Sequence, residues 1–215
     1  MRKDNSILLN PELPKTVMVG GREMPIHWGF RTGMRMDCMR FDKRKTDAEN
    51  MADMVNAFYV NPSRALSHGP QSAVDAMLIF FSRGSYKPAG KDAESHEVAA
   101  GKTARAYDFA QDADTILGDF FSNYGMMLNR MDDEDLHWWE FMAMFSGLPE
   151  KSTIRTYMFY RTCSLSGLSK NEQKRIRKIR SRIRVREDYE DAELSQAKRL
   201  EKRNERWLAI AKGYS

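Results

Sequence analysis

The stretch Asp132–Glu150, DDEDLHWWEFMAMFSGLPE, constrains the fold of this chain more than any other part of its sequence. It predicts a helix that Gly147 and Pro149 end. Its apolar side chains fall on two nearly opposite sides of a helical wheel: Leu136, Trp139, Met142 and Ala143 on one, and Trp138, Phe141 and Phe145 on the other. Such a helix either lies centrally in a core or packs on its own domain with one face and on a partner with the other.

The acids that open this stretch have a structural explanation. We expect Asp132 or Asp133 to cap the helix and the acids behind it to occupy the first turn, where the helix dipole favours negative charge. A calcium loop needs oxygen ligands spread through about twelve residues around a central glycine, and that spacing is absent. His137 stands alone beside Trp138, which favours a packed or half-exposed role over catalysis. We therefore predict neither a metal site nor a cofactor.

Periodicity elsewhere predicts a mainly α-helical fold, a helical bundle. Thr46 and Glu49 form a capping-box pattern before one predicted helix, and Pro70 lies near the start of a second. The clearest signal covers residues 105–124, where apolar side chains share one broad arc and acids occupy the opposite arc. Gly125 is the expected C-terminal cap of that helix.

A small β-hairpin is predicted near the N-terminus, over residues 14–31. Apolar side chains alternate with others on both sides of Gly20-Gly21, and two glycines supply the positive φ angles of a tight turn. Two strands alone are marginally stable, so we expect the hairpin to pack on the helices.

Four segments follow from these patterns. Residues 1–84 form an N-terminal part of hairpin and helices, and residues 105–168 form an aromatic helical core. Residues 85–104 lack periodicity and bulky apolar side chains, so they are predicted to be a flexible linker. Residues 169–215 are predicted to form a long charged helix.

The C-terminal helix is predicted to start at a second capping box, Ser169 and Glu172, and to run to about residue 210. Its length of roughly 60 Å exceeds what one small domain needs, so its second half is expected to project into solvent or to contact another subunit. Residues 170–186 carry nine basic side chains against the single acid Glu172. That strip suits an acidic surface, a helix–helix contact or, as an open alternative, nucleic acid.

The sequence offers no pattern for catalysis. The two cysteines, Cys38 and Cys163, belong to no metal-binding motif and indicate a cytosolic protein without a disulfide framework. Glycine-rich phosphate loops, GxSxG and HExxH are missing, and the histidines are scattered singly. No apolar stretch is long enough to span a bilayer, so we expect neither an enzyme nor a membrane protein.

Several motifs resemble the gene-product-fifteen family of tailed bacteriophages that infect Gram-positive bacteria. The resemblance covers roughly residues 13–185 and is most specific over 107–161. Its motifs are Tyr107-Asp108-Phe109, Tyr124-Gly125, Leu136-His137-Trp138-Trp139 with Phe141, Gly147-Leu148 and Tyr160-Arg161, with Phe30-Arg31 and Phe80-Phe81 upstream. The tail after residue 187 has no counterpart in the family's pattern.

The resemblance implies a non-enzymatic tail assembly chaperone, encoded between the tail-tube and tape measure proteins. Such a protein would solubilise the tape measure protein and recruit major tail-tube subunits in the host cytoplasm, and would be absent from the virion. A homo-oligomer is possible, and a structural virion protein is the alternative. Our hypothesis is that a docking face, Trp138, Phe141 and Phe145, binds the tape measure helix, with secondary contacts from four basic side chains, Arg175, Arg177, Lys178 and Arg180.

Overall fold

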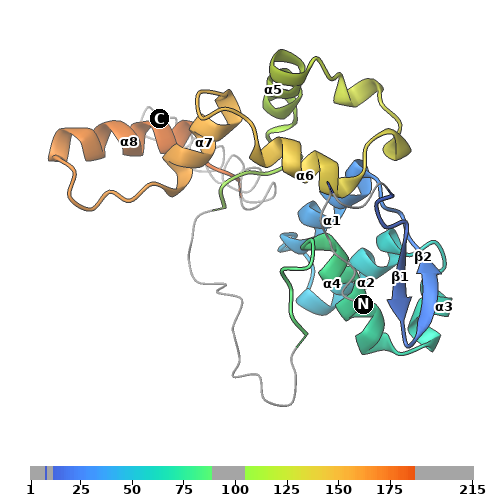
Figure 1. Cartoon of the computed structure of the whole chain (residues 1–215). Helices are drawn as coiled ribbons and strands as arrows, with labels where there is room; N and C mark the ends of the chain where they lie inside the picture. The colour runs from blue at the N-terminus through green and yellow to red at the C-terminus, as the bar shows by residue number, and fades with distance from the viewer. Residues whose placement is uncertain (1–7, 9–11, 89–104, 187–215) are drawn as a thin grey trace, which may run out of the picture.

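The computed structural model describes Leu8, residues 12–88 and residues 105–186 (Figure 1). Within these ranges the fold is mainly helical with one two-stranded antiparallel sheet, which confirms the predicted fold class. Most of the predicted linker, residues 89–104, and the chain after residue 186 lie outside the described residues. No helix among the described residues is long and apolar enough to cross a membrane.

The predicted hairpin is confirmed. Strands β1 (Thr16–Val19) and β2 (Arg22–Pro25) pair in antiparallel register, and the turn residues Gly20 and Gly21 have φ angles of 54° and 78°. The hairpin packs on helix α4 (Pro70–Phe81), where the backbone N–H of Gly20 donates to the Ser72 hydroxyl at 3.0 Å.

Four helices follow the hairpin: α1 (Phe30–Arg40), α2 (Asp47–Phe58), α3 (Pro62–Ser67) and α4 (Pro70–Phe81). The predicted capping box starts α2, because Thr46 Oγ1 accepts from the Glu49 N–H and Glu49 accepts from the Thr46 N–H. Asn61 caps α3 through its side chain, with Pro62 at the first helical position.

The second half contains α5 (Ala113–Tyr124), α6 (Trp138–Ser146), α7 (Thr153–Thr162) and α8 (Lys170–Ile183), with short 3₁₀ turns η1 (Leu128–Arg130) and η2 (Asp133–Asp135). Helix α5 begins at Ala113 rather than near residue 105. The Asp108 carboxylate instead accepts from the N–H groups of Ala110 and Gln111, and this local turn replaces helical hydrogen bonds. Gly125 caps α5 in the left-handed conformation, as predicted.

One hydrophobic core joins residues on both sides of the predicted 85–104 linker. Helix α6 lies across the N-terminal helices (Figure 1), and the indole N–H of Trp139 donates to the Phe80 carbonyl at 2.8 Å. The Phe30 N–H likewise donates to the Leu136 carbonyl at 3.0 Å. The core therefore extends across the predicted boundary between residues 1–84 and 105–168.

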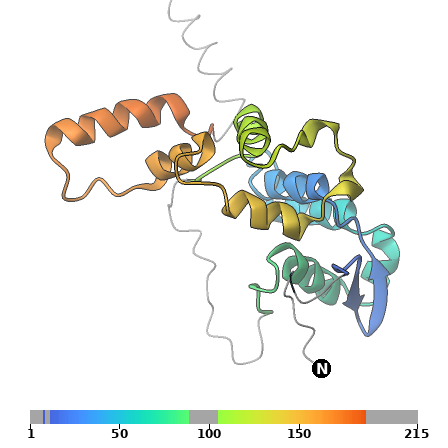
Figure 2. The ribbon, with the colours of Figure 1, turned by 45° about the horizontal axis from the view of Figure 1, so that its top comes forward.

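Helix α8 lies apart from this core and contacts mainly α7 (Figures 1 and 2). The helix ends at Ile183, so the continuous helix predicted to run on toward residue 210 is interrupted within the described chain. Side chains take over the backbone groups there: Gln111 donates to the Arg184 carbonyl and accepts from the Arg186 N–H. The predicted extension beyond residue 186 lies outside the described residues.

Candidate partner-binding surfaces

The acids before α6 cap a different helix from the one that the sequence suggested. Asp133 reaches the start of α1, where its Oδ1 accepts from the Arg31 N–H at 2.7 Å and its Oδ2 accepts from the Thr32 hydroxyl at 2.9 Å. Asp132 caps only the short turn η2. The expectation that these acids cap the aromatic helix and occupy its first turn is therefore wrong, because α6 begins only at Trp138 and a long-range contact holds Asp133 at α1.

His137 is the residue that caps α6. Its Nδ1 accepts from the Trp139 N–H at 3.0 Å, and its Nε2 lies 3.1 Å from the Pro14 carbonyl, which requires a proton on Nε2. The ring stacks on Trp28 at 5.5 Å. Burial lowers the pKa of His137 below its ordinary value of 6.5. This histidine is a neutral, packed structural residue, in agreement with the sequence-based interpretation.

The predicted docking face of α6 is enclosed by the protein's own chain. Trp138, Phe141 and Phe145 are 2%, 0% and 3% exposed. Trp138 stacks on Phe81 at 5.3 Å and donates its indole N–H to the Phe81 carbonyl. Phe141 stacks on Phe120, and Phe145 contacts Tyr107 edge-on. The hypothesis of an exposed aromatic face is therefore wrong for this structure, and the central-helix interpretation of α6 holds.

Gly33 shows how closely α6 and α1 approach. A Cβ atom added to Gly33 would lie 2.1 Å from the ring of Trp138. The Trp138 indole therefore rests directly on the backbone of α1, a contact that only glycine permits. No local sequence pattern indicates this pairing, because the two residues lie far apart along the chain.

The four predicted basic contacts lie on α8, which has no buried residue. Arg175 and Lys178 are exposed, and Arg177 donates only to Gln173, one turn away. Arg180 differs, because it donates to the carbonyls of Tyr160 and Cys163 at the end of α7. Three of the four are thus available to a partner, and the fourth joins α8 to α7.

A buried ion pair that no sequence pattern indicated connects α7 and the end of α8 to the core. Arg161 on α7 donates to both carboxylate oxygens of Asp112 at 2.6 and 2.8 Å, and both side chains are almost fully buried. Its guanidinium also donates to the carbonyls of Ala106 and Ile183, so it binds the end of α8. Arg161 belongs to the Tyr160-Arg161 motif, but its partner looked like an ordinary solvent-facing acid.

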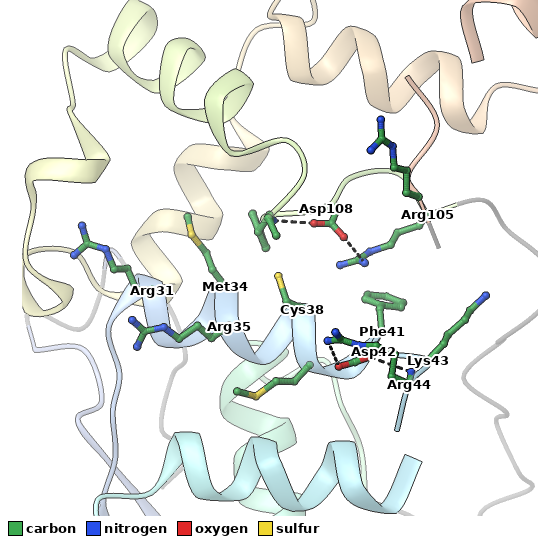
Figure 3. A pocket seen from close by; sticks show the side chains of 14 residues that line it. Arg31, Met34, Arg35, Cys38, Phe41, Asp42, Lys43, Arg44, Arg105 and Asp108 are labelled. Atoms are coloured by element: carbon green, nitrogen blue, oxygen red, sulfur yellow. Dashed lines mark hydrogen bonds and ion pairs between the residues drawn. The ribbon is translucent and has the colours of Figure 1, made fainter. Parts of the chain in front are cut away.

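A groove lies between α1 and the chain segment 105–110 (Figure 3). Arg186 is also among the residues that line it. The groove encloses about 640 Å³. Met34, Cys38, Met39, Phe41 and Phe109 give it apolar walls, and the basic side chains around it are Arg31, Arg35, Lys43, Arg44, Arg105 and Arg186. Among the described residues that line it, two are acids, Asp42 and Asp108, so this part of the chain gives the groove an excess of positive charge.

The charges of the groove are unevenly matched. Asp42 pairs with Arg44 and Asp108 pairs with Arg105, at 2.8 and 2.7 Å, so both acids are neutralised within the fold. Arg35 and Arg186 are exposed, and neither forms an ion pair within the described chain. Arg105 also stacks on Phe41 at 4.0 Å. The groove therefore suits a ligand that combines carboxylates with an apolar side chain.

Cys38 lines the groove but is not activated as a nucleophile. Burial raises the pKa of the Cys38 thiol above its ordinary value, and the nearby carboxylates of Asp108 and Asp37 act in the same direction. A protonated thiol is a poor nucleophile near neutral pH. Among the described residues, no group of three or more His, Cys, Asp or Glu side chains is placed to hold a metal ion.

A comparison with protein families gives one match that covers most of the chain. The model of the family described as Bacteriophage Gp15 protein matches residues 9–185. No curated protein and no solved structure matches the chain significantly. The matched range includes the hairpin, the aromatic core, all of α8 and every residue that lines the groove except Arg186.

Proposed function

The chain belongs to the bacteriophage Gp15 family, a family of phage structural or morphogenesis proteins, and from this premise we propose that it is a tail assembly chaperone. In this role it binds the tape measure protein, keeps it soluble and helps to recruit major tail-tube subunits. It acts in the cytoplasm of the infected bacterium and is absent from the finished virion. No catalytic step is part of the proposal.

The observation that carries this proposal is the groove between α1 and residues 105–110. A tape measure protein is a long, largely helical chain whose apolar segments need cover. An amphipathic helix with acids beside its apolar stripe would place an apolar side chain against Met34 and Phe109 and carboxylates near Arg35 and Arg186. The groove, rather than the buried side chains of Trp138, Phe141 and Phe145, is therefore our proposed contact surface for the tape measure helix.

Helix α8 supports the same function with a second surface. Ile176, Ile179 and Ile183 form a half-buried stripe beside exposed basic side chains. A helix of this kind pairs with another amphipathic helix, and its charge favours an acidic one. Arg175, Arg177 and Lys178 remain our proposed secondary contacts, whereas Arg180 is engaged with α7.

Co-expression with the tape measure protein tests the proposal. We expect the wild-type chain to keep the tape measure protein in the soluble fraction. Arg35→Glu combined with Arg186→Glu is expected to return most of it to the pellet, because the groove then repels acidic segments. Arg22→Glu combined with Arg64→Glu makes the same total charge change at two exposed positions outside the groove and is the matched control. If the groove variant solubilises as well as wild type while remaining folded, the groove assignment fails.

Membership of this family also suits a structural phage protein, so a lasting place in the virion is the second candidate. Mass spectrometry of purified virions separates the two, since a chaperone should be missing from them. Nucleic-acid binding by residues 170–186 makes a different prediction. Retention of DNA or RNA should fall steeply as salt rises, and the chaperone proposal expects weak retention at physiological salt.

A further inference from the structure

Gly118 lies in the middle of α5, and the packing of the described residues supplies no reason for a glycine there. A Cβ atom added there would meet nothing within 4 Å, whereas one added at Gly33 would strike the Trp138 ring. Glycine inside a helix is less favourable than alanine because it loses more backbone freedom on folding. The glycine at 118 therefore needs an explanation from outside the described chain.

Gly118 opens onto a hollow between α5 and the chain near η1, which we call the α5 hollow. It encloses about 450 Å³ and is lined by Asp114, Leu117, Gly118, Phe121, Met127 and Arg130. Phe121 is 55% exposed, a large apolar side chain left in water. A glycine beside exposed apolar side chains forms a hole into which a bulky side chain of another molecule can insert.

The charges at the edges of the α5 hollow complement each other. Asp114 and Arg130 are both exposed, and neither forms an ion pair with another described residue. One acid and one base leave the hollow without net charge, unlike the groove and α8, whose positive charge would repel a second copy. In an isologous interface, a contact between Asp114 of one copy and Arg130 of the other is repeated by the two-fold axis, so this self-complementary pair of charges suits a second copy of the chain.

We propose that the α5 hollow is the interface between two copies of this chain. Helix α5 of one copy packs on α5 of the other, and the missing side chain at Gly118 lets Phe121 of the second copy insert. Asp114 and Arg130 pair across the two-fold axis and set its register. This interface is independent of the groove and of the proposed function.

Substitutions at Gly118 test the proposal with effects of opposite sign. In sedimentation velocity of the full chain, we expect wild type to pass from monomer to dimer as its concentration rises from about 1 to 200 µM, a range suited to a small interface. Gly118→Leu should fill the hole and raise the dimer dissociation constant at least tenfold. Gly118→Ala should raise the Tm of the monomer by about 2–4 °C, because alanine favours the helix, while weakening the dimer. The Tm is measured at the lowest concentration, where dimerisation adds no stability.

Asn123→Leu is the matched control for the added bulk, since Asn123 is exposed on α5 and does not line the hollow. It should dimerise like wild type. A charge swap then identifies the second copy as the occupant. Asp114→Arg alone and Arg130→Asp alone should each weaken self-association a few-fold. An equimolar mixture of the two variants should regain wild-type association, because only the mixed dimer pairs opposite charges at both edges.

Three results would overturn the proposal. The first is that wild type remains monomeric over the whole concentration range. The second is that Gly118→Leu associates as tightly as wild type. The third is that the mixture of charge variants associates no better than each variant alone. Circular dichroism of every variant confirms that the helices remain, so a loss of association is not read from an unfolded chain.

Discussion

Helices α6 and α8 are the two most distinctive segments of the sequence, and the fold treats them in opposite ways. Four residues of α6 are fully buried and pack from both sides, whereas α8 has no buried residue. Aromatic residues are typical of protein interfaces and of cores alike, so α6 could not be assigned from composition. The contrast shows that only surfaces that the fold leaves uncovered are available to a partner: the aromatic surface of α6 is enclosed, whereas the basic surface of α8 is open.

A substitution in the buried helix α6 should have the strongest effect on stability. Trp138→Ala should reduce the free energy of unfolding by about 3–5 kcal/mol, because it removes a buried indole that packs between Gly33 and Phe81. Urea denaturation monitored by circular dichroism measures the loss. Phe159→Ala is the control, since Phe159 on α7 is exposed and its removal should change stability by less than about 0.5 kcal/mol. A small loss for Trp138→Ala would mean that α6 is not the centre of the core.

The next effect concerns the connection between the two regions. Arg161→Met should destabilise the protein by about 3 kcal/mol, because it leaves the Asp112 carboxylate buried without its partner. It should also increase hydrogen exchange in α8, whose last carbonyl loses the Arg161 donor. The double variant Asp112→Leu, Arg161→Met removes both charges and should recover part of the stability. Equal losses in the single and double variants would contradict the importance of the pair.

The buried His137 predicts that the stability of the fold depends on pH. Because burial lowers its pKa in the folded state, the unfolded chain binds the proton first as pH falls. Stability should therefore be complete above about pH 6.5 and decrease as pH falls from there toward the folded-state pKa. Urea midpoints at pH 7.5 and 5.5 measure the decrease. His137→Asn keeps a capping side chain that does not titrate, so the difference between the two pH values should shrink in that variant.

The smallest effects on stability should appear on α8. Arg175→Ala and Lys178→Ala should change the free energy of unfolding by less than about 0.5 kcal/mol, because both side chains are exposed. Arg180→Ala should reduce it by about 1–2 kcal/mol, because Arg180 donates to the carbonyls of Tyr160 and Cys163. Thermal unfolding of the three variants side by side separates surface charge from structural charge. Three equal shifts would mean that α8 is held to α7 in another way.

Local signals in the sequence predicted local structure well. The glycine pair of the hairpin, the capping boxes at Thr46 and Ser169 and the left-handed cap at Gly125 all appear as expected. Each depends on residues within a few positions of one another, so the sequence contains the whole interaction. The start of α5 and the end of α8 were missed because side chains of Asp108 and Gln111 take over backbone groups there.

The candidate site was harder to predict, because its parts come from distant segments. The groove joins α1 to residues 105–110 and Arg186, and no local pattern indicates that these meet. Asp133 looked like a cap for its own helix but serves α1, and Asp112 looked solvent-facing but is buried against Arg161. Both acids interact with partners from distant segments, which a local sequence pattern does not identify.

By itself, the sequence determined the helical fold class, the hairpin, most helix caps and the family motifs, because periodicity and capping act within a turn or two of the chain. The tertiary structure decided which faces remain exposed. It enclosed the aromatic face of α6, left the groove and α8 open and left Gly118 facing solvent. Burial depends on which distant segments pack together, and a helical wheel gives the direction of an apolar face but not what covers it.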